Sequence, residues 1–198
     1  MIRNIVFDMV GVVMVFDRDG YYRQRAVSPA DQRLLEREVF RSLEFAMGDR
    51  GAISEEDAIT SICGRVPERL HGVVADLIYR RHDILPVPGM PALLSRLKAA
   101  GYRLYLLTNI SVAIHRFRDA IPGIALFDDT MASCDVHLVK PDPAIFRLAC
   151  GRFGIDPAES AFIDDSSFNA EAARHVGMRA FVFNGDADEV QKWIASLA

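Results

Sequence analysis

Short strand-like runs alternate with helical segments along most of the chain, and this alternation constrains the fold more than any other feature. The predicted strands occupy residues 4–7, 103–107, 129–133, 161–163 and 180–183, and helical patterns separate the last four. Because strands joined through helices form a parallel sheet covered on both faces, we predict an α/β protein with a doubly wound parallel sheet. The apolar share of 51% is large enough to bury such a core.

A long helical stretch interrupts the alternation after the first strand. From about residue 15 to 85 the pattern is helical and strongly charged, and we expect roughly four helices with no strand among them. Apolar residues from Leu34 to Met47 predict one of these helices, with Gly48 as its stop. We therefore predict a core domain of residues 1–14 and 86–198 and an inserted helical domain of residues 15–85. The two connections, near 13–17 and 84–89, are expected to act as hinges.

Charge and cysteine usage indicate the compartment and the partners. The net charge of -4 gives no electrostatic argument for nucleic acid or an anionic membrane as a partner, and Arg80-Arg81 is interpreted as a solvated helix face. No apolar stretch approaches the ~20 residues that cross a bilayer. Cys63, Cys134 and Cys150 are isolated, which is typical of free thiols in a reducing compartment. We expect a cytoplasmic protein, and the oligomeric state stays open.

Polar residues follow three of the predicted strands. Asp8 comes after the first strand, Thr108-Asn109 after the second and Asp164-Asp165 after the fourth. Taken alone, each has a plainer interpretation, as a turn or as a helix cap. Ligands of open parallel sheets, however, bind beyond the carboxyl ends of the strands. We therefore expect these side chains to converge on one crevice.

Three of these residues suit a metal ion. Asp8, Asp164 and Asp165 would repel one another unless a cation lay between them. A small set of hard oxygen ligands suits Mg²⁺, which keeps several waters and shares a substrate phosphate. The acidic residues therefore predict a magnesium site.

The other residues suit a phosphate. Lys140 would supply a mobile positive charge, and its plainer interpretation is the solvated start of a helix. The Thr108 hydroxyl and the backbone N–H of Asn109 would donate hydrogen bonds. Asp8 would then be able to attack phosphorus and form an aspartyl-phosphate intermediate. The predicted partner is a small phosphorylated metabolite.

Four motifs resemble those of the haloacid dehalogenase-like hydrolases. They are Phe7-Asp8-x-x-Gly11-Val12, Leu106-Leu107-Thr108-Asn109, the run from Lys140 to Phe146, and Phe162-Ile163-Asp164-Asp165 with Asn169-x-Glu171 after it. The helical insert resembles the small α-helical cap that closes over the site in one subclass of this family and selects the substrate. The resemblance implies that Asp8 is the nucleophile. It also implies that Mg²⁺ is held by Asp8, the backbone carbonyl of Val10, Asp164 and Asp165.

Val10 departs from the family pattern. Phosphatases of the family usually have an aspartate at this position, which serves as general acid and base, and valine cannot transfer a proton. Losing such a group typically costs about 10²–10⁴ in rate. A related branch of sugar-phosphate phosphatases carries glycine here, so the acid is not mandatory. We expect a preference for esters with good leaving groups and a pocket narrowed by the valine side chain.

Three functions fit these residues, and a Mg²⁺-dependent phosphatase acting on a sugar phosphate-like metabolite fits best. A 2-haloacid dehalogenase would use Asp8 to attack carbon without a metal, but family dehalogenases carry serines and asparagine where this chain has Asp164-Asp165. A non-catalytic binding or regulatory relative would keep the phosphate cradle and lose turnover through Val10. The substrate itself stays open. Residues of the insert that are candidates to face it are Asp17, Arg18, Glu44 and the turn of residues 48–51.

Overall fold

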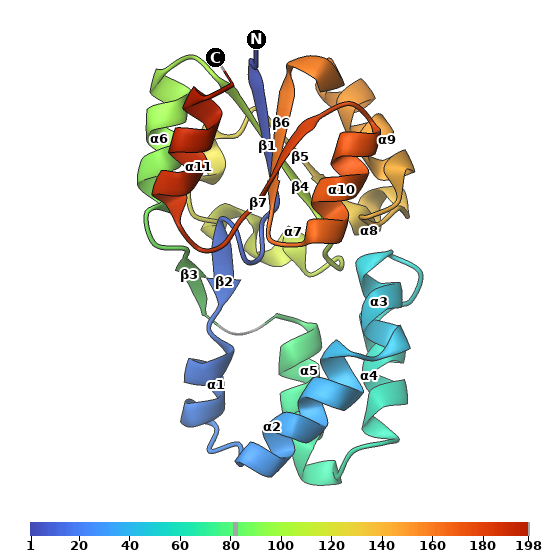
Figure 1. Cartoon of the computed structure of the whole chain (residues 1–198). Coiled ribbons are helices and arrows are strands. Elements are labelled where there is room, and N and C mark those ends of the chain that lie inside the picture. Colours follow the sequence, from blue (N-terminus) through green and yellow to red (C-terminus); the bar gives the residue numbers. More distant parts are fainter. Residues whose placement is uncertain (81–82, 198) are drawn as a thin grey trace.

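The protein consists of an α/β unit with a helical lobe at one end of its sheet (Figure 1). The computed structural model describes residues 1–80 and 83–197. All five strands of the main sheet pair in parallel, in the order β5-β4-β1-β6-β7. These strands are β1 (Asn4–Phe7), β4 (Arg103–Thr108), β5 (Asp129–Ala132), β6 (Ser160–Asp164) and β7 (Arg179–Val182). The predicted fold class, a doubly wound parallel sheet with an inserted helical cap, is confirmed.

Strand β1 occupies the centre of the sheet. Its residue Ile5 pairs with Leu104 of β4 on one side and with Ala161 of β6 on the other. All four residues of β1 are buried, as expected for a strand covered on both faces. The residue that follows β1 therefore lies between the ends of two neighbouring strands.

Two helical layers cover the sheet (Figure 1). Helices α6 (Met90–Ala99) and α11 (Ala187–Ala195) pack on one face, where Leu93 and Ile194 join the core formed with Ile5 and Phe7. Helices α9 (Pro143–Phe153) and α10 (Ser167–His175) pack on the other face. The apolar stripes that predict these helices in the sequence are thus the faces that they bury.

Short elements complete the α/β unit. They are α7 (Ile114–Phe117), α8 (Ser133–Val136) and the 3₁₀ turns Arg118–Ala120, Ile124–Leu126 and Pro157–Glu159. The helix expected near residues 111–120 is therefore shorter than predicted, because it passes into a 3₁₀ turn after Phe117.

The helical cap is the segment between β2 (Met14–Phe16) and β3 (Ile84–Pro86), and it has its own apolar core. Its helices are α1 (Arg18–Gln24), α2 (Pro29–Leu35), α3 (Leu43–Asp49), α4 (Glu55–Cys63) and α5 (His71–Ile78), with a π-helical segment at Glu36–Phe40 and a 3₁₀ turn at Glu68–Leu70. The single helix predicted from Leu34 to Met47 is wrong. The Ser42 side chain accepts the Phe45 backbone N–H and starts a new helix, α3, which continues through Gly48.

The two connections between cap and core form an antiparallel ribbon. Val15 of β2 pairs with Leu85 of β3, although some seventy residues separate them along the chain. The expectation of no strand between residues 15 and 85 is therefore wrong, because the two crossings lie side by side and satisfy each other's backbone groups. The predicted domain boundaries at 14/15 and 85/86 fall inside this ribbon and stay predictions.

Two further features bear on the sequence-based expectations. None of the helices formed by residues 1–80 and 83–197 combines the length and the apolar character needed to cross a bilayer. Cys63, Cys134 and Cys150 are free thiols, two of them buried.

Candidate active site

The strand ends bring the predicted polar residues to one edge of the sheet. Asp8 directly follows β1, Thr108 is the last residue of β4, and Asp164 is the last residue of β6. Since β1 lies between β4 and β6, Asp8 lies between the other two. After Asp8 the chain turns sharply, because the backbone N–H groups of Val13 and Met14 both donate to the Met9 carbonyl.

Lys140 joins two of the carboxylates. Its Nζ donates to Asp164 Oδ2 at 2.7 Å and to the Leu107 carbonyl at 2.9 Å, and it lies 2.8 Å from Asp8 Oδ1. The Lys140 side chain is 1% exposed, so it is neither the mobile charge nor the solvated helix start considered from the sequence. Helix α9 begins instead with Asp142 as its cap. Lys140 is a fixed, buried ammonium.

Two asparagines hold this arrangement in place. The Asn109 side chain donates to the Lys140 carbonyl and accepts from the Lys140 N–H, both at 2.8 Å. Asn169, one helical turn into α10, donates to both oxygens of Asp164. The side chain of Asn109 therefore positions Lys140, a role that the sequence did not suggest. Its backbone N–H as a phosphate donor stays a prediction.

Asp8, Asp164 and Asp165 form an oxygen-rich group suited to a cation. One oxygen from each lies within 4.8 Å of the others. Burial, and secondly the neighbouring Asp164, raise the pKa of Asp165. Burial raises the pKa of Asp8 to about 6, although Lys140 acts in the opposite direction. Asp8 and Asp164 are buried whereas Asp165 is exposed, and a hard divalent cation would relieve the repulsion among the three carboxylates, so the donor set fits Mg²⁺.

Gly11 allows the Asp165 carboxylate to lie close to the backbone of the turn that follows Asp8. A Cβ atom at this position would lie 2.5 Å from Asp165 Oδ2, and the φ of +88° is one that favours glycine. The alternative reading of the acidic pair as a helix cap does not hold, because Ser166 caps α10. Asp165 is therefore directed toward the turn that follows Asp8.

Thr108 carries a polar atom without a partner. Its side-chain oxygen is buried and makes no hydrogen bond among the described residues. Such an orphan is costly in a native structure and is usually explained by a missing ligand, ion or water. The hydroxyl is thus free to bind a ligand, and its role as a phosphate donor stays a prediction.

A cleft lies between this edge of the sheet and the cap. Its volume is about 860 Å³, counted with its open mouth, and Val10, Asn109 and Asp165 line it from the core. Val10 lines this cleft, and valine offers no proton. Whether its carbonyl contacts a metal stays a prediction.

The cap contributes charged residues to the same cleft. Arg18, Asp49 and Arg80 line it, and of these Arg18 and Asp49 are candidates from the sequence. Asp17 instead caps α1 by accepting the Gly20 N–H, and Glu44 is held by Arg65.

The interpretation of Arg80 as part of a solvated helix face is wrong. Its side chain is only 9% exposed and points into the fold after α5 has ended, with a φ of +56° that helical periodicity does not foresee. Arg81 lies outside the described residues. No pattern in the sequence distinguishes Arg80 from the surface arginines of the cap.

The parallel sheet, the inserted cap and the acidic group at the strand ends define the class of protein, and comparison with known proteins identifies its family. The family model of the haloacid dehalogenase-like hydrolases matches residues 2–177. The chain is 30% identical over 198 residues to flavin mononucleotide hydrolase 1 of Arabidopsis thaliana, covering 98% of this chain and 76% of the relative. The chain therefore belongs to the haloacid dehalogenase-like hydrolases.

Other relatives show how diverse the family is. The (S)-2-haloacid dehalogenase 4A of Burkholderia cepacia is 26% identical over 77% of this chain and 67% of its own length. Several other curated relatives are phosphatases. Among solved structures, a family enzyme of Bacteroides thetaiotaomicron in complex with magnesium and inorganic phosphate has a TM-score of 0.70 at 22% identity, covering 93% of this chain and 96% of that one. At this identity the likeness shows the fold.

Proposed function

We propose that this protein is a Mg²⁺-dependent phosphatase that hydrolyses a small phosphorylated metabolite, of the sugar phosphate kind, through an aspartyl-phosphate on Asp8. The observation that carries the proposal is the buried Lys140, whose Nζ lies within 2.8 Å of both Asp8 and Asp164. The third carboxylate, Asp165, completes a group that suits a divalent cation. We also propose a cytoplasmic location, where free cysteines stay reduced.

The residues of the site have different roles in binding a phosphate and a metal ion. Thr108 donates its unpartnered hydroxyl to one phosphate oxygen, and Lys140 offsets negative charge from within the site. Asp8, Asp164 and Asp165 would hold Mg²⁺, with the carbonyl of Val10 as a further predicted ligand. When bound, Mg²⁺ supplies positive charge against the phosphate oxygens.

Asp8 carries the covalent step. One of its carboxylate oxygens forms a bond to phosphorus while the bond from phosphorus to the ester oxygen breaks. The departing oxygen takes its proton from water, because Val10 has none to give. Water then cleaves the acyl phosphate and releases inorganic phosphate with a free Asp8. Esters with better leaving groups, such as aryl phosphates and sugar 1-phosphates, depend least on a general acid and should therefore react fastest.

A panel of phosphoesters, assayed for phosphate release with Mg²⁺ and with a chelator, tests this function. We expect release that depends on Mg²⁺, favours good leaving groups and disappears in Asp8→Asn. No release from any ester, together with calorimetric binding of phosphate and Mg²⁺, would indicate the non-catalytic relative instead.

The same protein preparation tests the dehalogenase alternative. We consider this alternative because the relative from Burkholderia cepacia is a 2-haloacid dehalogenase. Chloride release from 2-chloropropionate that is insensitive to the chelator would replace the phosphatase proposal. Asp165 argues against this outcome, because a carboxylate at this position is suited to binding a metal ion, and a dehalogenase that attacks carbon needs no metal.

A further inference from the structure

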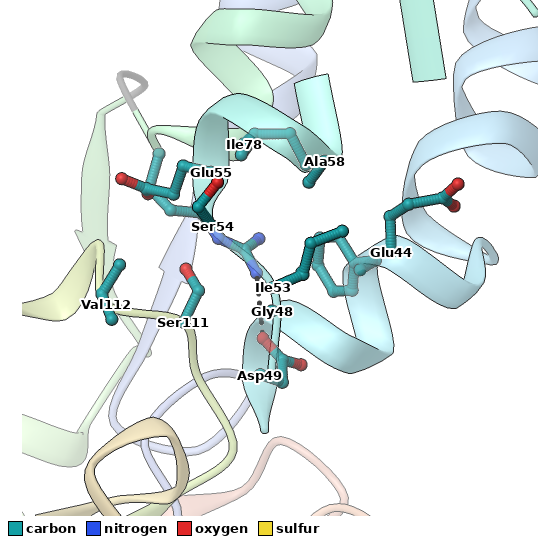
Figure 2. Close-up of a pocket in the computed structure, with 12 residues that line it drawn as sticks. Glu44, Gly48, Asp49, Ile53, Ser54, Glu55, Ala58, Ile78, Ser111 and Val112 are labelled. Carbon is teal, nitrogen blue, oxygen red and sulfur yellow. Dashed lines mark ion pairs between the residues drawn. The ribbon is translucent and has the colours of Figure 1, made fainter. Parts of the chain in front are cut away.

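Two charged residues of the cap lie deep in the cleft that leads to Asp8. Asp49 ends α3 and Arg80 follows α5, and both line the cleft together with Val10 and Asp165 of the core. The same two residues also line a second hollow of about 340 Å³, counted with the open solvent at its mouth, and most of its walls come from the cap (Figure 2). They therefore stand where a leaving group bound beside Asp8 would extend into the cap.

Neither residue has its hydrogen-bonding capacity satisfied. Asp49 Oδ1 and Arg80 Nε are buried and have no hydrogen-bond partner among the described residues. The ion pair between them, marked in Figure 2, spans 3.8 Å from Nη2 to Oδ1, which is too long for a hydrogen bond. Phe16 and Phe45 flank the guanidinium, with ring centres 5.3 Å and 4.5 Å away. An unpartnered acceptor on Asp49 thus lies near a guanidinium whose Nε is an unpartnered donor, and no hydrogen bond joins the two residues.

Asp49 is fixed relative to the core. Its carbonyl accepts a hydrogen bond from the Ser133 hydroxyl. Arg50, the next residue, donates to the His137 carbonyl at 3.0 Å, and its own carbonyl lies 3.1 Å from His137 Nδ1. These contacts join the turn after α3 to helix α8. The open acceptor is therefore held at a set place over the cleft.

Each cation on the cap side of the cleft has an acidic neighbour. Arg18, which is 46% exposed, lies 3.4 Å from Glu36, a carboxylate that Arg41 also contacts, and Arg80 pairs with Asp49. Burial raises the pKa of Asp49 to about 6, while Arg80 and the backbone N–H of Ser111, which approaches the carboxylate, act in the opposite direction. A second phosphate or a carboxylate bound beside Arg80 would compete with Asp49 for this guanidinium and would be repelled by the Asp49 carboxylate. A hydroxyl, in contrast, both donates and accepts, and it can satisfy Asp49 Oδ1 and Arg80 Nε together.

We propose that Asp49 and Arg80 form a clamp for a hydroxyl group on the leaving group, so that the protein selects neutral, hydroxyl-bearing phosphate monoesters over phosphocarboxylates and bisphosphates. The inference rests on the proposed phosphatase function and specifies its substrate class. The clamp acts in binding and orientation, and it takes no part in the transfer of the phosphoryl group.

Relative kcat/KM values for three kinds of ester test the clamp. The probes are p-nitrophenyl phosphate, which has no hydroxyl on its leaving group, neutral sugar monophosphates such as glucose 1-phosphate, and 2-phosphoglycolate. In Arg80→Met and Asp49→Asn we expect kcat/KM for the best sugar phosphate to fall at least about tenfold, and that for p-nitrophenyl phosphate to stay within about twofold. Asp49→Asn, which leaves Arg80 uncompensated, should also shift the preference toward 2-phosphoglycolate.

Arg69→Met is the matched control. Arg69 belongs to the cap but is 60% exposed and pairs with Asp31. All three esters should keep their wild-type values in this variant. Retained activity on p-nitrophenyl phosphate shows that Arg80→Met and Asp49→Asn are folded.

The two proposals fail in different ways. If the wild-type protein hydrolyses none of the esters, the phosphatase function is wrong. If it hydrolyses p-nitrophenyl phosphate but prefers 2-phosphoglycolate to every sugar phosphate, the clamp is overturned while the function stands. The clamp is also overturned if the variants lose activity equally on all esters or lose none.

Discussion

Replacing Lys140 with methionine tests whether this ammonium holds the carboxylates of the site together. Lys140 is 1% exposed, and its partners Asp164 and Asp8 have side chains that are 0% and 12% exposed. Removing one partner of a buried ion pair leaves the other charge without compensation, which typically costs about 3–5 kcal/mol. We expect a loss of this size in the free energy of unfolding of the metal-free protein at about pH 8.

The loss should depend on pH because of Asp8. Burial raises the pKa of Asp8 from 3.8 to about 6, and Lys140 lowers it against that trend. A carboxyl group whose pKa is higher in the folded state favours folding at low pH, and this contribution disappears as the pH rises through the folded-state pKa. For the wild type the shift amounts to roughly 3 kcal/mol. Without Lys140 the pKa of Asp8 rises further, so the variant should lose at least about 1 kcal/mol less at pH 5 than at pH 8.

Urea unfolding in the presence of a chelator, at both pH values, measures these losses. The control is Lys98→Met, since Lys98 pairs with Asp128 at 2.6 Å but is 34% exposed. An exposed pair contributes about 0–1 kcal/mol, so the control should lose little at either pH. A loss for Lys140→Met that is equal at both pH values, or no larger than that of Lys98→Met, would refute the reasoning.

Further predictions concern the cap contact, the phosphate cradle and the missing acid. A Cβ at Gly51 would collide with the Cys134 carbonyl, whereas one at Gly101 meets nothing within 4 Å although its φ is also positive. Gly51→Ala should therefore lower kcat/KM at least about tenfold. The control Gly101→Ala should cost only about 1–2 kcal/mol of stability and leave kcat/KM unchanged. Equal kcat/KM values in the two variants would contradict a role for the contact between Gly51 and Cys134. Thr108→Val should lower kcat/KM about tenfold or more. It should not lower the thermal stability, because it removes a buried hydroxyl that has no hydrogen-bond partner among the described residues. A clear drop in melting temperature would show that the hydroxyl has a structural partner. Val10→Asp should raise kcat for alkyl phosphates at least about tenfold and change kcat for p-nitrophenyl phosphate little. The measurement is the ratio of the two kcat values, and an unchanged ratio would contradict the role assigned to position 10.

The topology of the core could be predicted because its signals are local. Asp8, Thr108 and Asp164 each follow a short apolar strand, and the rule that parallel strands present their carboxyl ends at one edge brings them together. The chemical roles of these residues stay predictions until the assays are done.

Other features depend on contacts that no local pattern reveals. The pairing of Val15 with Leu85 joins two three-residue strands at opposite ends of the cap, each too short to show periodicity. Arg80 resembles a surface arginine in sequence, yet the fold returns it to the interior after α5. The fixed position of Lys140 likewise arises from Asn109, whose side chain meets it across 31 positions of the chain.

Transfer of phosphate to Asp8 is the most direct test of the proposed function. The wild-type protein and Asp8→Asn are each mixed with Mg²⁺ and a phosphoester radiolabelled in its phosphate, quenched in acid, and assayed for label on the protein and for free phosphate. We expect label on the wild-type protein, located to the peptide that contains Asp8, and neither label nor phosphate release in Asp8→Asn. Phosphate release that persists in folded Asp8→Asn would contradict the account.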